Sequence, residues 1–311
     1  MVKKGILALL CAALLLCAAC GGRQPGETVP AEGAAVTDVL GSTARLASDA
    51  RVVCGYASFA QCWMLAGGVP VGVTDDALTE RGLDLPEDTA VVGTTKHVDL
   101  EKVAALEPDY VMLSADLTAH LELRDTLERM GIPCGFFRVD TFADYQALMA
   151  QLCAVTGRED LYRANVTEPG TRIGEILAAV PKQEDRSVLL LRAYASGVKA
   201  KGDDILAGVI LKEYGLRNIV DDAPSLLEDL SMEEIIRRDP HWIFVVTMGD
   251  EAAAAAYMRQ NLESDPAWNG LSAVREGRCV LLPQDLFHYK PNERWDESYE
   301  YLAKILYPDL F

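Results

Sequence analysis

The chain has 311 residues, of which 50% are apolar and 24% charged, and this ordinary globular composition excludes a collagen-like, coiled-coil or wholly disordered chain. Its 47 acidic residues outnumber its 29 Lys and Arg residues, which gives a formal net charge of −18. Because a protein that binds duplex nucleic acid needs a positive surface to displace phosphate counterions, this charge argues against nucleic acid as a partner.

The first twenty residues have the features of an export signal. Lys3 and Lys4 precede an uncharged, mostly apolar run over 5–19, which is shorter than the roughly 20 residues that a membrane-spanning helix needs. The run ends in Leu-Cys-Ala-Ala-Cys20, which resembles a bacterial lipobox, where the last Cys becomes the lipidated first residue of the mature chain. We therefore expect a signal peptide over 1–19 and a lipid on Cys20. An ordinary signal peptide cut after residue 19, or an uncleaved anchor, is the alternative.

Residues 20–37 are interpreted as the lipidated Cys and a tether. The segment 21–35 is rich in Gly, Pro, Ala and Glu and has no apolar periodicity, which is typical of a flexible linker. Loss of Lys3 and Lys4 with the signal peptide changes the formal charge from −18 to −20. The expected location is extracytoplasmic, with a lipid anchor in the outer face of the cell membrane.

Five cysteines remain in the expected folded part: Cys54, Cys62, Cys134, Cys153 and Cys279. None forms a C-x-x-C pair, so there is no zinc-ribbon or redox signature. Those in apolar strand-like runs are expected to pack as small hydrophobic residues. A Cys54–Cys62 disulfide is the alternative for an oxidising compartment.

Strands and helices alternate along the rest of the chain. Short β-branched runs predict strands at 51–54, 69–73, 110–113, 133–139, 187–192, 242–247 and 278–282. Most are followed by amphipathic stretches, for example 117–130, 204–214 and 295–306. This alternation indicates an α/β fold with parallel sheets and crossover helices.

An internal repeat divides the chain into two lobes. Residues 100–113 align with 232–245, and both copies read as a short helix, an acidic residue with Pro as a stop, an aromatic residue and a buried strand. We therefore expect two Rossmann-like α/β lobes over 38–142 and 186–311, with a ligand cleft between them at the carboxyl ends of the strands.

A long helical connector over 143–185 is expected to join the two lobes, because apolar residues recur there at helical spacing. Gly157 and Pro169-Gly170 interrupt this pattern, so the connector is either two helices or one kinked helix. Such a stiff connector predicts limited hinge motion.

The motifs of common enzymes are missing from the sequence. There is no P-loop, G-x-S-x-G, G-x-G-x-x-G or H-E-x-x-H, and four His residues supply a metal cage poorly. We therefore predict a protein that is not an enzyme and that has no resident cofactor.

The order and spacing of several segments resemble one family over nearly all of the expected mature chain. They are VTDVLG (36–41), RVV (51–53), LAGG (65–68), VGVTDD (71–76), DLE to PD (99–109), GIP (131–133), DPAW (265–268) and AVREGR (273–278). With them the chain resembles the solute-binding proteins of ABC importers for ferric siderophores, haem or cobalamin, a two-lobed class joined by a rigid helix.

The resemblance implies that the protein captures an iron complex as a monomer and delivers it to a permease that works with an ATPase. A cobalamin-binding protein of the same family, a metal-dependent enzyme and a sensor lipoprotein on the same fold are the alternatives.

The family also has a Glu on each lobe that pairs with Arg residues of the permease. The matching residue in the second lobe is Glu233, within Ser-Met-Glu at the start of the repeated helix. In the first lobe Glu122 is the nearest match, and Glu101 is the alternative that the repeat suggests. Each is equally explained as a solvated carboxylate, which a helix N-terminus favours.

Candidate ligand-binding residues follow the predicted strand ends, and most are cationic or aromatic. They are Ser58, Lys96, His97, Arg192, Tyr194, Lys199, Lys201, His288, Tyr289, Lys290 and Arg294, with Asp116 and Trp295 nearby. Arg binds carboxylates in a bidentate way, and Tyr and Trp offer flat apolar faces. This cleft therefore favours an anionic iron chelate or haem propionates over cobalamin.

The four His residues have different predicted roles. His288, and by the same reasoning His97, either coordinates iron of the ligand directly or lines the cleft through hydrogen bonds. A zinc or manganese site from these two His residues and carboxylates is a weaker rival. His120 and His241 are expected at the surface or on helix flanks.

Overall fold

A computed structural model describes residues 33–181 and 186–311. The expected signal peptide, Cys20 and most of the expected tether lie outside the described residues. The first strand, β1 (Ala34–Thr37), pairs antiparallel with β2 (Thr43–Leu46) and packs on helix α6 (Phe142–Thr156). Val36 is fully buried there, so β1 belongs to the first lobe although the sequence assigned these residues to the tether.

The first sheet has five parallel strands in the order β5-β4-β3-β8-β9. Their bounds are β3 (Val52–Cys54), β4 (Pro70–Val73), β5 (Ala90–Val91), β8 (Tyr110–Ser114) and β9 (Cys134–Phe137). The helices that follow them are α1 (Ala57–Leu65), α2 (Asp76–Thr79), α3 (Leu100–Ala105), α4 (Thr118–Leu121) and α5 (Arg124–Arg129). The hairpin of β6 (Gly93–Thr94) and β7 (His97–Val98) follows β5. The stretch 117–130 is thus two helices, because a tight turn from the Leu123 N–H to the His120 carbonyl interrupts it.

The second sheet has the order β11-β10-β13-β14, with β12 also paired to β10. Its strands are β10 (Ser187–Tyr194), β11 (Gly197–Lys201), β12 (Arg217–Asn218), β13 (Trp242–Thr247) and β14 (Cys279–Leu282). Only β11 runs antiparallel within this described sheet. Its helices are α9 (Leu206–Glu213), α10 (Ile219–Asp222), α11 (Met232–Arg238), α12 (Glu251–Asn261), α13 (Pro266–Asn269), α14 (Ser272–Arg275) and α15 (Gln284–Phe287).

The internal repeat is confirmed, because the two copies share the same N-cap and the same backbone conformation at the end of the helix. Asp99 and Ser231, at matching positions, are the N-caps of α3 and α11, and their side chains accept hydrogen bonds from the first backbone N–H groups. Glu107 and Asp239, the residues before the two prolines, both adopt positive φ, at 45° and 38°. The two-lobed α/β fold is therefore as predicted, with the predicted strand runs in two separate sheets.

The connector is two helices. Helix α6 ends at Gly157, whose φ of 71° is the left-handed conformation that favours Gly. The chain then runs on through α7 (Glu159–Tyr162), a π-helical segment (Arg163–Thr167) and α8 (Glu168–Ala179). Pro169 does not end this helix, although it offers no N–H to the carbonyl of Asn165. The hydroxyl of Tyr145 donates to that carbonyl at 3.1 Å.

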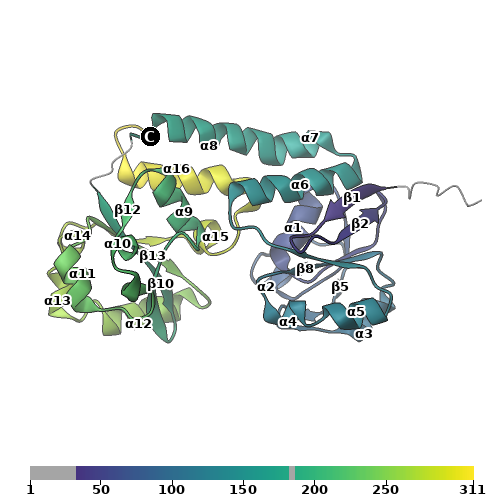
Figure 1. Cartoon of the computed structure of the whole chain (residues 1–311), viewed down its shortest axis with the longest axis horizontal. Coiled ribbons are helices and arrows are strands. Elements are labelled where there is room, and N and C mark those ends of the chain that lie inside the picture. Colours follow the sequence, from purple (N-terminus) through teal and green to yellow (C-terminus); the bar gives the residue numbers. More distant parts are fainter. Residues whose placement is uncertain (1–32, 182–185) are drawn as a thin grey trace, which may run out of the picture. The chain divides into compact units, whose positions relative to one another are not determined.

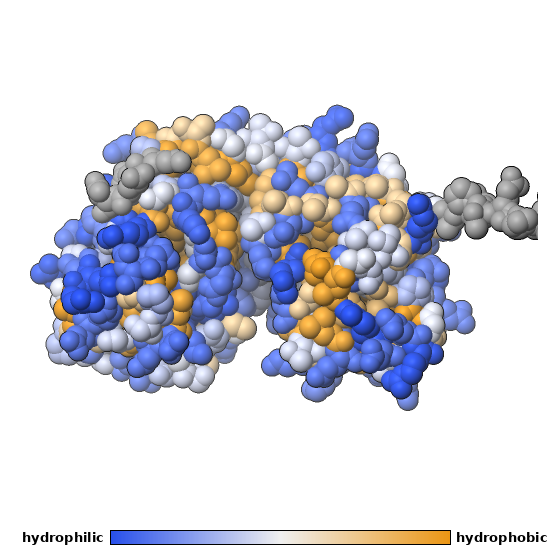
Figure 2. All heavy atoms as spheres, viewed as in Figure 1, coloured by the Kyte–Doolittle hydropathy of each residue, from blue (hydrophilic) through white to orange (hydrophobic). Residues whose placement is uncertain are grey.

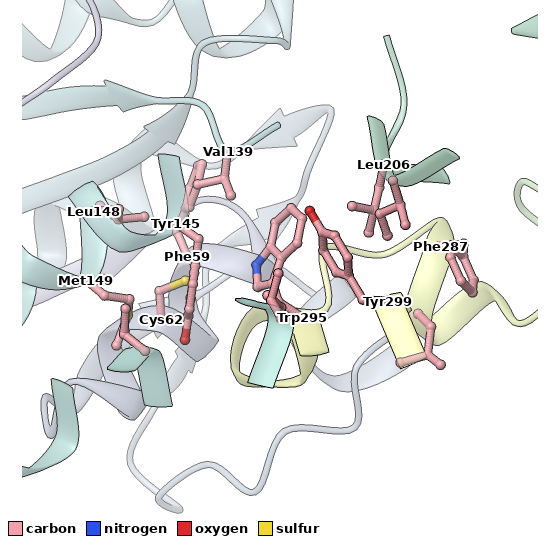
Figure 3. Close-up of a cluster of buried hydrophobic side chains, with 14 of the residues drawn as sticks. Phe59, Cys62, Val139, Tyr145, Leu148, Met149, Leu206, Phe287, Trp295 and Tyr299 are labelled. Atoms are coloured by element: carbon pink, nitrogen blue, oxygen red, sulfur yellow. The ribbon is translucent and has the colours of Figure 1, made fainter. Parts of the chain in front are cut away.

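The last helix, α16 (Trp295–Leu306), packs along α8 and joins the cores of both lobes (Figure 1). Trp295 is fully buried, with its ring centroid 5.9 Å from Phe142 and 6.4 Å from Tyr145. Figure 3 shows it between Phe59 and the residues around Tyr299. Trp295 is therefore a core residue and not part of the cleft surface near which the sequence placed it.

The cysteines of the described chain are all free. Cys54 and Cys62 are both buried, and burial raises the pKa of Cys62 to about 12, so its thiol stays protonated at neutral pH. The disulfide alternative is therefore not realised. In the part of the chain that the structure covers, no helix is long and apolar enough to cross a membrane.

Candidate functional site

The carboxyl ends of the strands in both sheets supply the polar groups of the candidate site. In the first lobe, β3 ends directly before α1, and the buried carboxylate of Asp76 accepts a hydrogen bond from the Ala57 N–H at 2.9 Å. Tyr56, Ser58 and Asp116 lie beside it at the same edge. The edge is rich in carboxylates, which fits the acidity of the whole chain.

The second lobe brings cations to the corresponding edge. Arg192 is near the end of β10, and His288, Tyr289 and Lys290 follow α15. Burial, Arg192 and Lys290 together lower the pKa of His288 to about 4, so its imidazole is neutral at physiological pH. The rings of His288 and Tyr289 lie 4.9 Å apart. We call Arg192, His288 and Lys290 the basic cluster.

Two polar atoms of the basic cluster are buried without a partner among the described residues. They are Nε of Arg192 and Nδ1 of His288. A buried polar atom without a hydrogen bond is costly, so such atoms often mark a place that a ligand or water completes. Arg192 and His288 therefore keep free hydrogen-bonding capacity, and the Arg192 N–H can donate to an anionic ligand.

Two pockets lie on either side of the His288–Lys290 segment. The larger, of about 470 Å³, is at the end of β14 and is lined by Glu251, Gln284 and Tyr289 among others. The smaller, of about 50 Å³, has Lys290 from the second lobe against Tyr56, Ser58 and Asp116 of the first. The surface in Figure 2 is mostly hydrophilic and is indented between the two lobes.

Direct contacts between the lobes frame the smaller pocket. Lys290 Nζ is 2.9 Å from Asp140 Oδ1, and its backbone carbonyl accepts a hydrogen bond from Arg81 at 2.6 Å. Asn292 is fully buried and contacts the Ser58 hydroxyl at 3.2 Å and the Gln61 side chain at 2.9 Å. The lobes thus meet through polar groups next to the candidate site.

Several predicted ligand-binding residues are occupied by other partners. Arg294 pairs with Asp285 at 2.9 Å and with Glu297 at 2.8 Å, and Lys201 pairs with Asp204. Ser58 is buried and hydrogen-bonded to Asn292. These side chains have less free hydrogen-bonding capacity for a ligand than Arg192 and His288 have.

The remaining predicted residues lie at the rims of the two edges. Tyr194 ends β10, and Lys199 in β11 is the cross-strand neighbour of Arg192, so its exposed side chain shares a face with that guanidinium. Lys96 and His97 are exposed on the β6–β7 hairpin of the first lobe. Their part in ligand binding stays a prediction.

The prediction for His120 is wrong, because this residue is fully buried. Its Nδ1 accepts a hydrogen bond from the Ser114 N–H at 2.9 Å, at the end of β8. His241 is intermediate in burial, at the start of β13. Across the described residues no group of three or more His, Cys, Asp or Glu is placed to hold a metal ion.

The predicted docking carboxylates are all exposed. Glu233 lies in the first turn of α11, Glu122 follows α4 at its C-terminal end, and Glu101 lies in the first turn of α3. Glu101 and Glu233 occupy matching positions of the repeat, whereas Glu122 does not. Their role stays a prediction.

Sequence reasoning missed the residues that connect the lobes. Asp140, which pairs with Lys290, follows β9 and could have been found by the same strand-end rule. Arg81 follows the short helix α2, and Asn292 lies in a one-turn helix, so neither has a strand-end signal.

Comparisons with known proteins agree with this arrangement. The model of the family described as "Periplasmic binding protein" matches residues 52–286. The Fe(3+)-citrate-binding protein YfmC of Bacillus subtilis is 23% identical over 90% of this chain and 89% of its own length. The putative ABC transporter substrate-binding lipoprotein YhfQ of the same organism is 24% identical over 89% of each chain.

A solved structure shares the fold. Staphylococcus aureus SirA, complexed with staphyloferrin B, superposes with a TM-score of 0.65 at 17% identity, over 88% of this chain and 98% of that chain. The arrangement of the two sheets and the helices that bridge them is thus a known fold. Because the family match covers most of the chain, this chain belongs to the periplasmic binding protein family as an extracytoplasmic solute-binding protein of ABC importers.

Proposed function

We propose that the protein captures an anionic ferric chelate at the basic cluster and delivers it to the permease of an ABC importer. The observation that carries this proposal is the pair of buried, unpartnered atoms, Arg192 Nε and His288 Nδ1, beside Lys290. Relatives named for ferric citrate support the ligand class. The iron is cargo, and no resident cofactor is needed.

Each member of the basic cluster has a distinct role in this proposal. Arg192 supplies a planar guanidinium that matches a carboxylate, and Lys290 supplies a point charge. His288 is neutral, so it donates or accepts a hydrogen bond without adding charge. Tyr289 offers a flat face at the mouth of the larger pocket.

The test is a ligand titration of the mature protein with ferric citrate, haemin and cobalamin, followed by tryptophan fluorescence and thermal unfolding. Ferric citrate should quench fluorescence saturably and raise the unfolding temperature, because a ligand that binds only the folded state stabilises it. Arg192→Met should weaken binding about tenfold or more, as expected for loss of a charged hydrogen bond. Arg259→Met, an exposed Arg of the same lobe, should not. Binding of cobalamin alone, or of none of the three, would refute the ligand class.

We also propose that Cys20 carries the lipid, that the protein acts as a monomer, and that Glu122 and Glu233 dock on the permease. The lipoprotein name of one relative supports the anchor. Cys20→Ala should release the protein from the membrane fraction, and sedimentation of the mature chain should give one copy. Replacement of both Glu residues by Ala should abolish uptake with unchanged ligand affinity, and normal uptake would contradict the docking role.

A further inference from the structure

Lys290 is the member of the basic cluster that already has an anionic partner. Its ammonium group lies 2.9 Å from Oδ1 of Asp140, which follows β9 in the first lobe. Both side chains are partly exposed, at 27% for Lys290 and 49% for Asp140. A carboxylate of the protein thus occupies a position on Lys290 that a carboxylate of an incoming chelate could take.

The surrounding charges leave Asp140 free to exchange its partner. Arg138 lies 3.9 Å from the Asp140 carboxylate, but the guanidinium of Arg138 is hydrogen-bonded to Asp116. The backbone N–H of Asp140 donates to Asp144, which itself caps α6. Asp140 is therefore held by its backbone, and only its side chain contacts Lys290.

The contact between Lys290 and Asp140 lowers the positive charge that the basic cluster offers to a ligand. Arg192 and Lys290 carry two positive charges, His288 is neutral, and Asp140 cancels one of them. Arg138 and Asp116 cancel each other. With Asp140 in place, an anion that approaches Lys290 finds the charge of the ammonium group partly neutralised, and it gains the whole of that charge only after it displaces Asp140.

We propose that Asp140 is a specificity-determining residue, an internal carboxylate that competes with the ligand for Lys290. A chelate with several carboxylates displaces it and gains both cations, whereas a weakly charged chelate does not. This inference rests on the proposed function and deepens it, because it names the charge of the ligand as the property that is selected.

The experiment compares Asp140→Asn with the parent protein by calorimetric titration with ferric citrate and with an uncharged ferric trihydroxamate. Removal of the competing carboxylate should tighten ferric citrate binding about threefold to fivefold, the size of an exposed ion pair. Binding of the uncharged chelate should stay the same. Glu175→Gln removes the same charge from an exposed pair with Arg172 on α8 and is the matched control, with no expected change.

A double-mutant cycle separates competition from a general change in charge. In a Lys290→Met background, which should bind ferric citrate more weakly, Asp140→Asn should no longer tighten binding. Equal or weaker binding by Asp140→Asn, or the same gain in the Lys290→Met background, would overturn the inference while leaving the proposed function intact. If neither the parent nor any variant binds a ferric chelate, the proposed function fails, and this inference fails with it. Thermal unfolding of each variant checks that it is folded.

Discussion

His288 illustrates how position within the fold changes the chemistry of a single side chain. Burial and the nearby charges of Arg192 and Lys290 lower its pKa to about 4, whereas a free imidazole titrates near 6.5. Between these values the unfolded chain binds a proton that the folded chain does not. Stability should therefore fall as pH drops from 6.5 to 4.

The first prediction concerns this pH dependence. The His288→Gln variant should lose less stability than the parent between pH 7 and pH 5, by about 1–2 kcal/mol, because it removes one site of proton uptake on unfolding. Burial also lowers the pKa values of His120 and His241, so the variant keeps part of the dependence. Denaturant unfolding at the two pH values measures the difference. The same loss in both proteins would contradict the prediction.

Most residues of the site were predicted from sequence because they lie at or shortly after the end of a predicted strand. Arg192 lies near the end of the apolar run that forms β10, whereas His288 and Lys290 follow α15, the short helix after β14. Which cation is free was not predicted, although Lys201 and Arg294 each have an acidic partner three residues further along the chain. The contact of Arg294 with Asp285 depends on the fold. The burial of His120 and Trp295 was also missed. Each has a polar ring nitrogen and lies near the start of a predicted amphipathic stretch, 117–130 and 295–306, so the sequence did not mark it as a core residue.

At the level of elements, long apolar runs predicted the strands well, since a strand buried on both faces reads as a continuous run. The strands β5, β6, β7 and β12 have two residues each, which is too short to give a pattern. The connector was predicted as helical, but its break could not be located. Gly157 ends α6, whereas Pro169 lies within a continuous helical segment, where the Tyr145 hydroxyl donates to the carbonyl that Pro169 leaves without an N–H donor.

The hydrogen bond from Tyr145 to the Asn165 carbonyl can be tested by substitution. Tyr145→Phe removes the hydroxyl that donates to the Asn165 carbonyl, and the loss should cost about 1–2 kcal/mol of unfolding free energy. Pro169→Ala restores a backbone N–H four residues after Asn165, so the same Tyr145 substitution should cost less in that background. Chemical denaturation of the four proteins in this cycle measures the coupling. Equal costs in both backgrounds would mean that the hydroxyl does not replace the missing N–H.

At the level of the whole molecule, polar contacts join the first lobe to the end of the second. Asn292 is fully buried with φ at 53°, and its side chain contacts Ser58 and Gln61 of α1. Asn tolerates this left-handed conformation better than other residues with side chains, apart from Asp. Asn292 thus has two roles: it adopts the local left-handed backbone conformation, and its side chain binds the first lobe.

The third prediction separates these two contributions. Asn292→Ala should destabilise the protein by about 3 kcal/mol, because it loses buried hydrogen bonds and strains the backbone. Asn292→Gly loses the same hydrogen bonds but adopts the positive φ freely, so it should cost less, by roughly 1 kcal/mol. Unfolding curves in denaturant give both values. A larger cost for Gly than for Ala would contradict the role of the backbone.

The burial of Trp295 against α6 has a consequence for the order in which the protein becomes structured. The chain emerges from its amino end during synthesis and export, and its first sheet and α6 are complete well before α16 follows. Until then Phe142 and Tyr145 lack the ring that covers them. This side of the first lobe therefore stays uncovered until nearly the whole polypeptide has been made, and a chain that stops short of α16 leaves the two rings of α6 without their aromatic partner.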